Sequence, residues 1–153
     1  MYVSVIGGDV ATCTEDDCKK AERIGAGIAR MGAVLICGGK GGVMEAACRG
    51  AVSQEGTTIG ILPGNSRDEG NEYLTHGIVT ALGAVRNSLV VLNGDIVVAI
   101  DGGYGTLSEI ALAIQYGKRV LGLGTWEIKG VESFDGVEEL LETLLEYKNQ
   151  KFI

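Results

Sequence analysis

The chain has 153 residues, of which 46% are hydrophobic and 22% are charged, so one globular domain over residues 1–153 with a sizeable core is expected. The net charge is −7 and the basic residues form no cluster, which argues against a nucleic-acid partner. No basic segment followed by an apolar stretch opens the sequence, and no apolar run reaches the length of a membrane span. We therefore expect a cytoplasmic protein with no membrane partner.

Taken in chain order, short apolar runs alternate with segments of helical periodicity. The predicted strands are 2–6, 33–37, 57–62, 78–80, 95–100 and 119–123, and residues 126–133 are either irregular or a last edge strand. The predicted helices are 14–31, 43–54, 83–92, one that follows the segment 101–109 and ends at Gly117, and an amphipathic helix from Val137. This alternation predicts a doubly wound, Rossmann-like α/β domain, in which a mainly parallel sheet carries helices on both faces.

The cysteines and the single histidine do not have the spacing of a metal site. Cys13, Cys18, Cys37 and Cys48 form no C-x-x-C pair, and His76 is alone, so no metal ligand is assigned. In a cytosolic chain we expect these thiols to be reduced. Cys37 and Cys48 are interpreted as small core residues.

Three predicted strands end in a pair of glycines. The pairs are Gly7–Gly8, Gly38–Gly39 and Gly102–Gly103. The carboxyl ends of parallel strands lie along one edge of the sheet, where ligands bind at the point of reversed strand order. This edge is therefore predicted to bind a nucleotide or another phosphorylated small molecule. Bound NAD is not expected, because the first turn is not G-x-G-x-x-G and no acidic residue ends the second strand.

The third of these turns, residues 101–109, lies between the apolar run 96–100 and a helical pattern. Its glycines leave the backbone open to a ligand. The first amides of a helix are unpaired and favour negative charge, so this turn is a candidate phosphate site. The alternative is a capping box from Thr106 to Glu109, which needs no ligand.

Two motifs resemble those of the LOG family, whose members were long labelled putative lysine decarboxylases. The segment 37–45 resembles the GGGxxGxM motif of that family, and the segment 101–109 resembles its PGGxGTxxE motif. Ile61–Gly64 and Arg86–Asn87 fall where the family has a Leu/Ile-Pro segment and an Arg-Lys pair. The resemblance extends to about Leu123. Characterised LOG proteins are cytokinin-nucleotide phosphoribohydrolases.

The chain also departs from those enzymes. Asp101 stands where they have Pro, Cys37 where they have Gly, Ser108 where they have the first of two Glu residues, and Asn87 where they have Lys. In these positions the chain looks more like a sister branch that includes the molybdenum-cofactor carrier proteins. Lysine decarboxylation is not expected, because no lysine has the context of a pyridoxal phosphate site.

The glycine turns and the resemblance together imply a set of site residues. The ligand-binding set is Gly8, Gly38, Gly39, Lys40, Gly41, Gly42, Arg86, Asn87, Gly102, Gly103, Tyr104, Gly105 and Thr106. Arg86 and Glu109 match the catalytic Arg and Glu of the family. Lys40 either offsets phosphate charge or is an exposed loop residue. Tyr104 either stacks on a ring of the ligand or covers the turn.

Two functions follow from this set. The first is a carrier or sensor that binds a nucleotide, phosphate or molybdopterin-type ligand and requires no other cofactor. The alternative is a nucleoside 5′-monophosphate phosphoribohydrolase that yields free base and ribose 5-phosphate. In that reaction Glu109 would stabilise the positive charge of the transition state, and Arg86 would hold the phosphate. The resemblance also implies a homodimer or a larger homo-oligomer.

Overall fold

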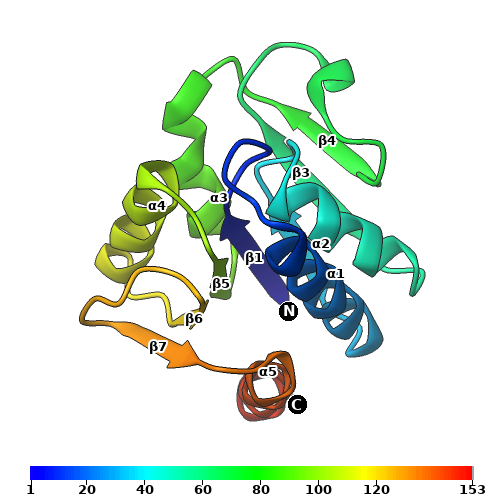
Figure 1. The fold of residues 1–153 in the computed structure, drawn as a ribbon. Coiled ribbons are helices and arrows are strands. Elements are labelled where there is room, and N and C mark those ends of the chain that lie inside the picture. The colour runs from blue at the N-terminus through cyan, green and yellow to red at the C-terminus, as the bar shows by residue number, and fades with distance from the viewer. Residues whose placement is uncertain (153) are drawn as a thin grey trace.

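Seven parallel strands form one sheet in the computed structural model, which describes residues 1–152 (Figure 1). The strands are β1 (Tyr2–Gly7), β2 (Val34–Cys37), β3 (Thr58–Leu62), β4 (His76–Val79), β5 (Ile96–Ile100), β6 (Val120–Leu123) and β7 (Val131–Phe134). Their order is β4-β3-β2-β1-β5-β6-β7. The predicted doubly wound α/β fold is confirmed, and residues 131–134 form the last edge strand. The strand order reverses between β1 and β5, which pair from Val3 with Ile96 to Gly7 with Ile100.

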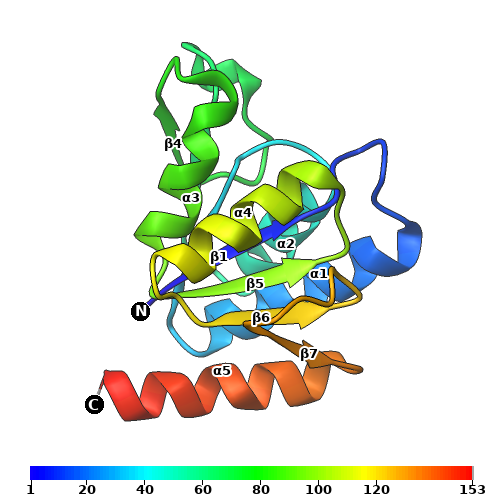
Figure 2. The same cartoon turned by 90° about the vertical axis from the view of Figure 1, so that its left-hand side faces the viewer.

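Five α-helices cover the two faces of the sheet. They are α1 (Glu15–Arg30), α2 (Val43–Val52), α3 (Asn87–Asn93), α4 (Tyr104–Gln115) and α5 (Val137–Lys151). Helices α1, α2 and α5 lie on one face, and α3 and α4 lie on the other (Figures 1 and 2). Within residues 1–152, no helix combines the length and the apolar character that a membrane crossing requires.

Strand β5, which lies between β1 and β6, is buried on both sides, as its unbroken apolar run predicts. Its residues alternate between two core clusters. Ile96, Val98 and Ile100 pack toward α1, α2 and α5, whereas Val97 and Ala99 pack toward α3 and α4. This double burial fixes the position of the turn that follows Ile100.

One predicted helix is divided in the structure. Residues 83–86 form a 3-10 turn, and the α-helix begins only at Asn87. Gly83 has φ +57° and Ala81 has φ +55°, so the chain enters this segment through left-handed conformations that an α-helix cannot include. The prediction of one continuous helix over 83–92 is therefore wrong for its first turn.

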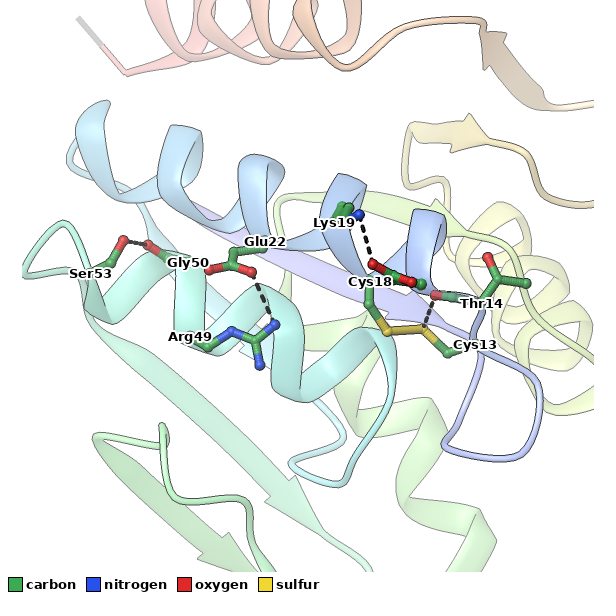
Figure 3. A network of polar contacts seen from close by, with 9 residues as sticks. Cys13, Thr14, Cys18, Lys19, Glu22, Arg49, Gly50 and Ser53 are labelled. Atoms are coloured by element: carbon green, nitrogen blue, oxygen red, sulfur yellow. Dashed lines mark hydrogen bonds and ion pairs between the residues drawn. A yellow bond between two sulfur atoms is a disulfide. The ribbon is translucent and has the colours of Figure 1, made fainter.

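Helices α1 and α2 approach each other closely. A Cβ on Gly25 would overlap the carbonyl oxygen of Ala47, and one on Gly50 would overlap that of Glu22. Glycine at these two places lets the helix backbones touch. The ion pair between Glu22 and Arg49, 3.0 Å long, crosses the same contact (Figure 3).

Cys13 and Cys18 form a disulfide at the start of α1 (Figure 3), so the expectation of reduced thiols is wrong for this pair. Thr14 caps the helix and shares a capping box with Asp17. The two cysteines therefore occupy the positions just before the cap and at the fourth helical residue, whose side chains meet in a hydrophobic staple. Their Cα atoms are 6.4 Å apart. Cys37 and Cys48 are free and buried, as expected of core residues.

Candidate functional site

A cavity of about 570 Å³ lies at the carboxyl ends of β1, β2 and β5. Its position at the reversal of strand order is where open α/β sheets bind ligands. Segments from several parts of the chain line it: Val5, Ile6, Gly7, Asp9, Thr12, Gly38, Lys40, Met44, Arg86, Asn87, Gly103, Tyr104, Gly105, Thr106 and Glu109. Its volume is within the range of small-molecule sites.

The turn after β5 is only three residues long. Asp101 has φ +52° and Gly102 has φ +111°, and Gly103 is the extended residue that precedes α4. Helix α4 thus begins at Tyr104, and Thr106 is its third residue rather than its cap. The capping-box alternative is therefore wrong. Thr106 instead packs beneath the turn, where a Cβ on Gly102 would overlap its hydroxyl group.

The first turn of α4 has free hydrogen-bond donors. The amide of Leu107 makes the first bond of the helix, to the carbonyl of Gly103 at 3.0 Å. The amides of Tyr104, Gly105 and Thr106 precede that bond and have no partner within the helix. No acidic residue lies in this first turn, and no side chain caps it. An anion is the group that this helix end favours.

The turn after β2 is closed by packing instead. The amide of Val43, the first residue of α2, donates to the carbonyl of Gly8 at 2.9 Å. A Cβ on Gly42 would overlap Gly8, and one on Gly41 would overlap Val10. A Cβ on Gly39 would lie 2.6 Å from the Leu62 side chain. Glycine at position 42, where φ is +72°, lets the backbones of the first two turns pack together.

The predicted ligand-binding set therefore divides into two groups. Gly38, Lys40, Arg86, Asn87, Gly103, Tyr104, Gly105 and Thr106 line the cavity, and so does Glu109. Gly8, Gly39, Gly41, Gly42 and Gly102 are not among the lining residues and pack against neighbouring segments. Asp9 and Thr12 also line the cavity and were missed from the sequence. Their place just after the first glycine pair, at the same sheet edge, was the signal for them.

Arg86 is the buried cation of the site, with 8% of its surface exposed. Its guanidinium donates to the carbonyl of Gly38 at 3.1 Å and to the side chain of Asn87. A Cβ on Gly38 would lie 2.7 Å from the guanidinium, so glycine is required there. The Nε of Arg86 is buried without a hydrogen-bond partner. Such a donor is costly to leave unpaired.

Lys40 and Asp101 point away from the cavity centre. The Lys40 ammonium donates to the carbonyl of Glu69 at 3.2 Å, which holds it toward the loop before β4. One carboxylate oxygen of Asp101, Oδ2, is buried without a hydrogen-bond partner. A Cβ on Gly8 would lie 2.5 Å from that oxygen, so the carboxylate is directed at Gly8. Asp101 is not among the residues that line the cavity.

Glu109 is the buried acid of the site, with 8% of its surface exposed. Burial raises its pKa to about 7, and the nearby charge of Arg86 opposes this rise. Protonated and ionised forms of Glu109 therefore coexist near neutral pH. The protonated form removes a negative charge from the cavity wall, which favours an anionic ligand.

The raised pKa of Glu109 predicts how folding stability depends on pH. The folded protein binds the proton of Glu109 more tightly than the unfolded chain, because the pKa of Glu109 is raised from 4.5 to about 7 on folding. The stabilisation from this proton is complete below pH 4.5 and is lost as pH rises through about 7. The free energy of unfolding should therefore fall between pH 5 and pH 8. This fall should be on the order of 2 kcal/mol larger in the native protein than in Glu109→Gln. Urea unfolding at both pH values measures this. Glu142→Gln, on the exposed side of α5, is the control, and equal falls in all three proteins would contradict the assignment.

Comparison with known proteins identifies relatives that share the fold. An uncharacterized protein of Archaeoglobus fulgidus is 42% identical over 140 residues, which cover 91% of each chain. The molybdenum cofactor binding protein of Rippkaea orientalis has a similar structure, with a TM-score of 0.88, 36% identity, and coverage of 95% of this chain and 96% of that one. The Moco carrier protein of Chlamydomonas reinhardtii has a TM-score of 0.89 at 31% identity, over 97% of this chain and 98% of that one.

A family model also matches the chain. The model of the SLOG cluster4 family matches residues 1–151, nearly the whole chain. The resemblance to a sister branch of the LOG family is thus confirmed. The chain belongs to the SLOG cluster4 family.

Proposed function

We propose that this protein binds a phosphorylated small molecule of the molybdopterin type and acts as its carrier or sensor. The observation that carries the proposal is that the first-turn amides of α4 and the guanidinium of Arg86 line the same cavity. The amides of Tyr104, Gly105 and Thr106 have no intrahelical partner, and Arg86 lies across the same cavity with an unpaired Nε. Amides at a helix start and a guanidinium are the groups that proteins use for phosphate. The Rippkaea and Chlamydomonas relatives, a molybdenum cofactor binding protein and a Moco carrier protein, supply the ligand class.

In the proposed complex the phosphate lies on the first-turn amides of α4. Gly105 has no side chain to exclude it, and Arg86 balances its charge. Tyr104, which is 82% exposed and lines the cavity, offers a ring face for the flat part of the ligand. A purine or a pterin attached to phosphate satisfies both requirements.

Gly105 gives the direct test of anion binding. A Cβ there meets nothing within 4 Å, so Gly105→Val should fold normally while its side chain crowds the first-turn amides. We expect its affinity for AMP and for inorganic phosphate to fall at least about tenfold, a loss of about 1.4 kcal/mol. Isothermal calorimetry measures the affinity, and Ala111→Val, at an exposed position of the same helix, is the matched control. Unchanged affinity in Gly105→Val would contradict the proposed site.

A second candidate function is cleavage of nucleoside 5′-monophosphates to base and ribose 5-phosphate. It is favoured by one observation, the presence of Glu109 and Arg86 on the wall of the same cavity. An ionised carboxylate beside the sugar would stabilise a cationic transition state. Burial of Glu109 works against this role, because it favours the neutral acid.

A panel of purine and pyrimidine monophosphates separates the two functions. For a carrier we expect no free base by chromatography, together with a higher melting temperature when the right ligand is bound. Release of base and ribose 5-phosphate that is abolished by Glu109→Ala would establish the enzyme instead. A variant that melts like the native protein shows that the loss is not one of folding.

We also propose that the protein forms a homodimer or a larger homo-oligomer. An apolar groove of about 430 Å³ on the face of β3 and β4 is lined by Tyr2, Ile36, Ile59, Ile61, Ile78, Thr80, Leu89 and Asn93. Parallel sheets are normally covered on both faces, and Leu82 and Val85 add exposed apolar surface nearby. A second copy of the chain is the proposed cover.

Light scattering after size-exclusion chromatography tests this assembly. We expect the native mass to be at least twice that of the chain. Ile78 lies in the groove and is 48% exposed, so a single chain should fold normally with Ile78→Glu. The glutamate would be buried without a partner in the proposed interface, so this variant should have the mass of one chain. A monomeric native protein would contradict the proposal.

A further inference from the structure

The loop that follows β6 crosses the turn between β5 and α4. The hydroxyl of Thr125 donates to the carbonyl of Asp101 at 2.7 Å. The indole Nε1 of Trp126 donates to the carbonyls of Gly102 and Gly103, both at 3.1 Å. All three carbonyls of the turn are therefore bound by one loop that is more than twenty residues further along the chain.

These bonds set the direction of the turn's amides. In a trans peptide the C=O and the following N–H point in opposite directions. When Trp126 holds the carbonyl of Gly103 on one side, the amide of Tyr104 is directed to the other. The carbonyls of Asp101 and Gly102 fix the amides of Gly102 and Gly103 in the same way. The loop therefore helps to orient the amide of Tyr104, the first of the three free donors of α4.

The turn depends on this support. Asp101 has φ +52°, a left-handed conformation that is uncommon for a residue with a side chain, and Gly102 has φ +111°. No side chain caps α4 from within the helix. Such backbone conformations persist where surrounding contacts hold them.

Trp126 also supports the aromatic wall of the cavity. Its ring packs on that of Tyr104, with 5.9 Å between the centroids and 34° between the planes. Tyr104 lines the cavity, whereas Trp126 does not. One indole thus contacts both the anion-binding turn and the ring that faces the ligand.

We propose that Trp126 is a positioning residue of the binding site, which sets affinity through the turn and Tyr104 without touching the ligand. This inference rests on the proposed function of the cavity. Trp126→Phe keeps an aromatic ring against Tyr104 and removes the Nε1 donor, and Thr125→Val removes the second support. We expect each variant to bind inorganic phosphate and AMP at least about fivefold more weakly by calorimetry, and the double variant to bind more weakly still.

The control separates positioning from a loss of stability. Leu112→Ala removes a partly buried side chain of α4 that packs in the core beside α3, away from the turn. It should lower the melting temperature and leave phosphate affinity unchanged, because a merely structural change does not alter the turn. Wild-type affinity in Trp126→Phe, or an equal loss in Leu112→Ala, would overturn the proposal.

A measurement without ligand tests the positioning by itself. In the native protein the ¹⁵N heteronuclear NOE values of residues 102–106 should equal those of residues 107–115 of α4. They should fall in Trp126→Phe but not in Leu112→Ala. Unchanged values in Trp126→Phe would overturn the inference even if the native protein binds phosphate. If the native protein binds neither probe, the proposed function fails, and the NOE values still decide whether Trp126 holds the turn.

Discussion

The free amides at the start of α4 are the feature on which the proposed binding site depends. The same chain shows how a helix start is closed when no ligand is needed. Helix α1 has a capping box between Thr14 and Asp17 and three acidic residues in its first turn. Helix α4 has neither a side-chain cap nor an acidic residue in its first turn. The donors and the positive end of the dipole are therefore available to a ligand in the cavity.

The sheet explains why these donors face a cavity. The order of strands reverses between β1 and β5, so the connections from these strands diverge to opposite faces and leave a space between them. The protein has a net charge of −7, but the cavity differs locally from this negative average. Arg86 is buried in its wall, burial favours the neutral form of Glu109, and the carboxylate of Asp101 is directed at Gly8. The proposed recognition of an anion thus rests on a few groups rather than on the whole surface.

Much of this could be predicted from the sequence, because periodicity and strand ends carry the information. The apolar run 96–100 predicted a doubly buried strand, and three glycine pairs predicted turns on one edge. Other features depend on contacts that a sequence does not display. Thr106 and Glu109 match a capping box, yet the left-handed Asp101 shortens the turn and the helix starts three residues earlier, at Tyr104. Likewise, some glycines line the cavity and others pack against neighbouring segments, and only the contacts of the folded chain distinguish the two groups. The approach of Cys13 to Cys18 depends on where α1 begins.

A crystal structure determined with AMP or phosphate tests the central claim most directly. We expect phosphate oxygens within hydrogen-bond distance of the amides of Tyr104, Gly105 and Thr106, with the Arg86 guanidinium facing the same anion. The claim is contradicted if the anion is well ordered at another place in the protein while the first turn of α4 holds only solvent.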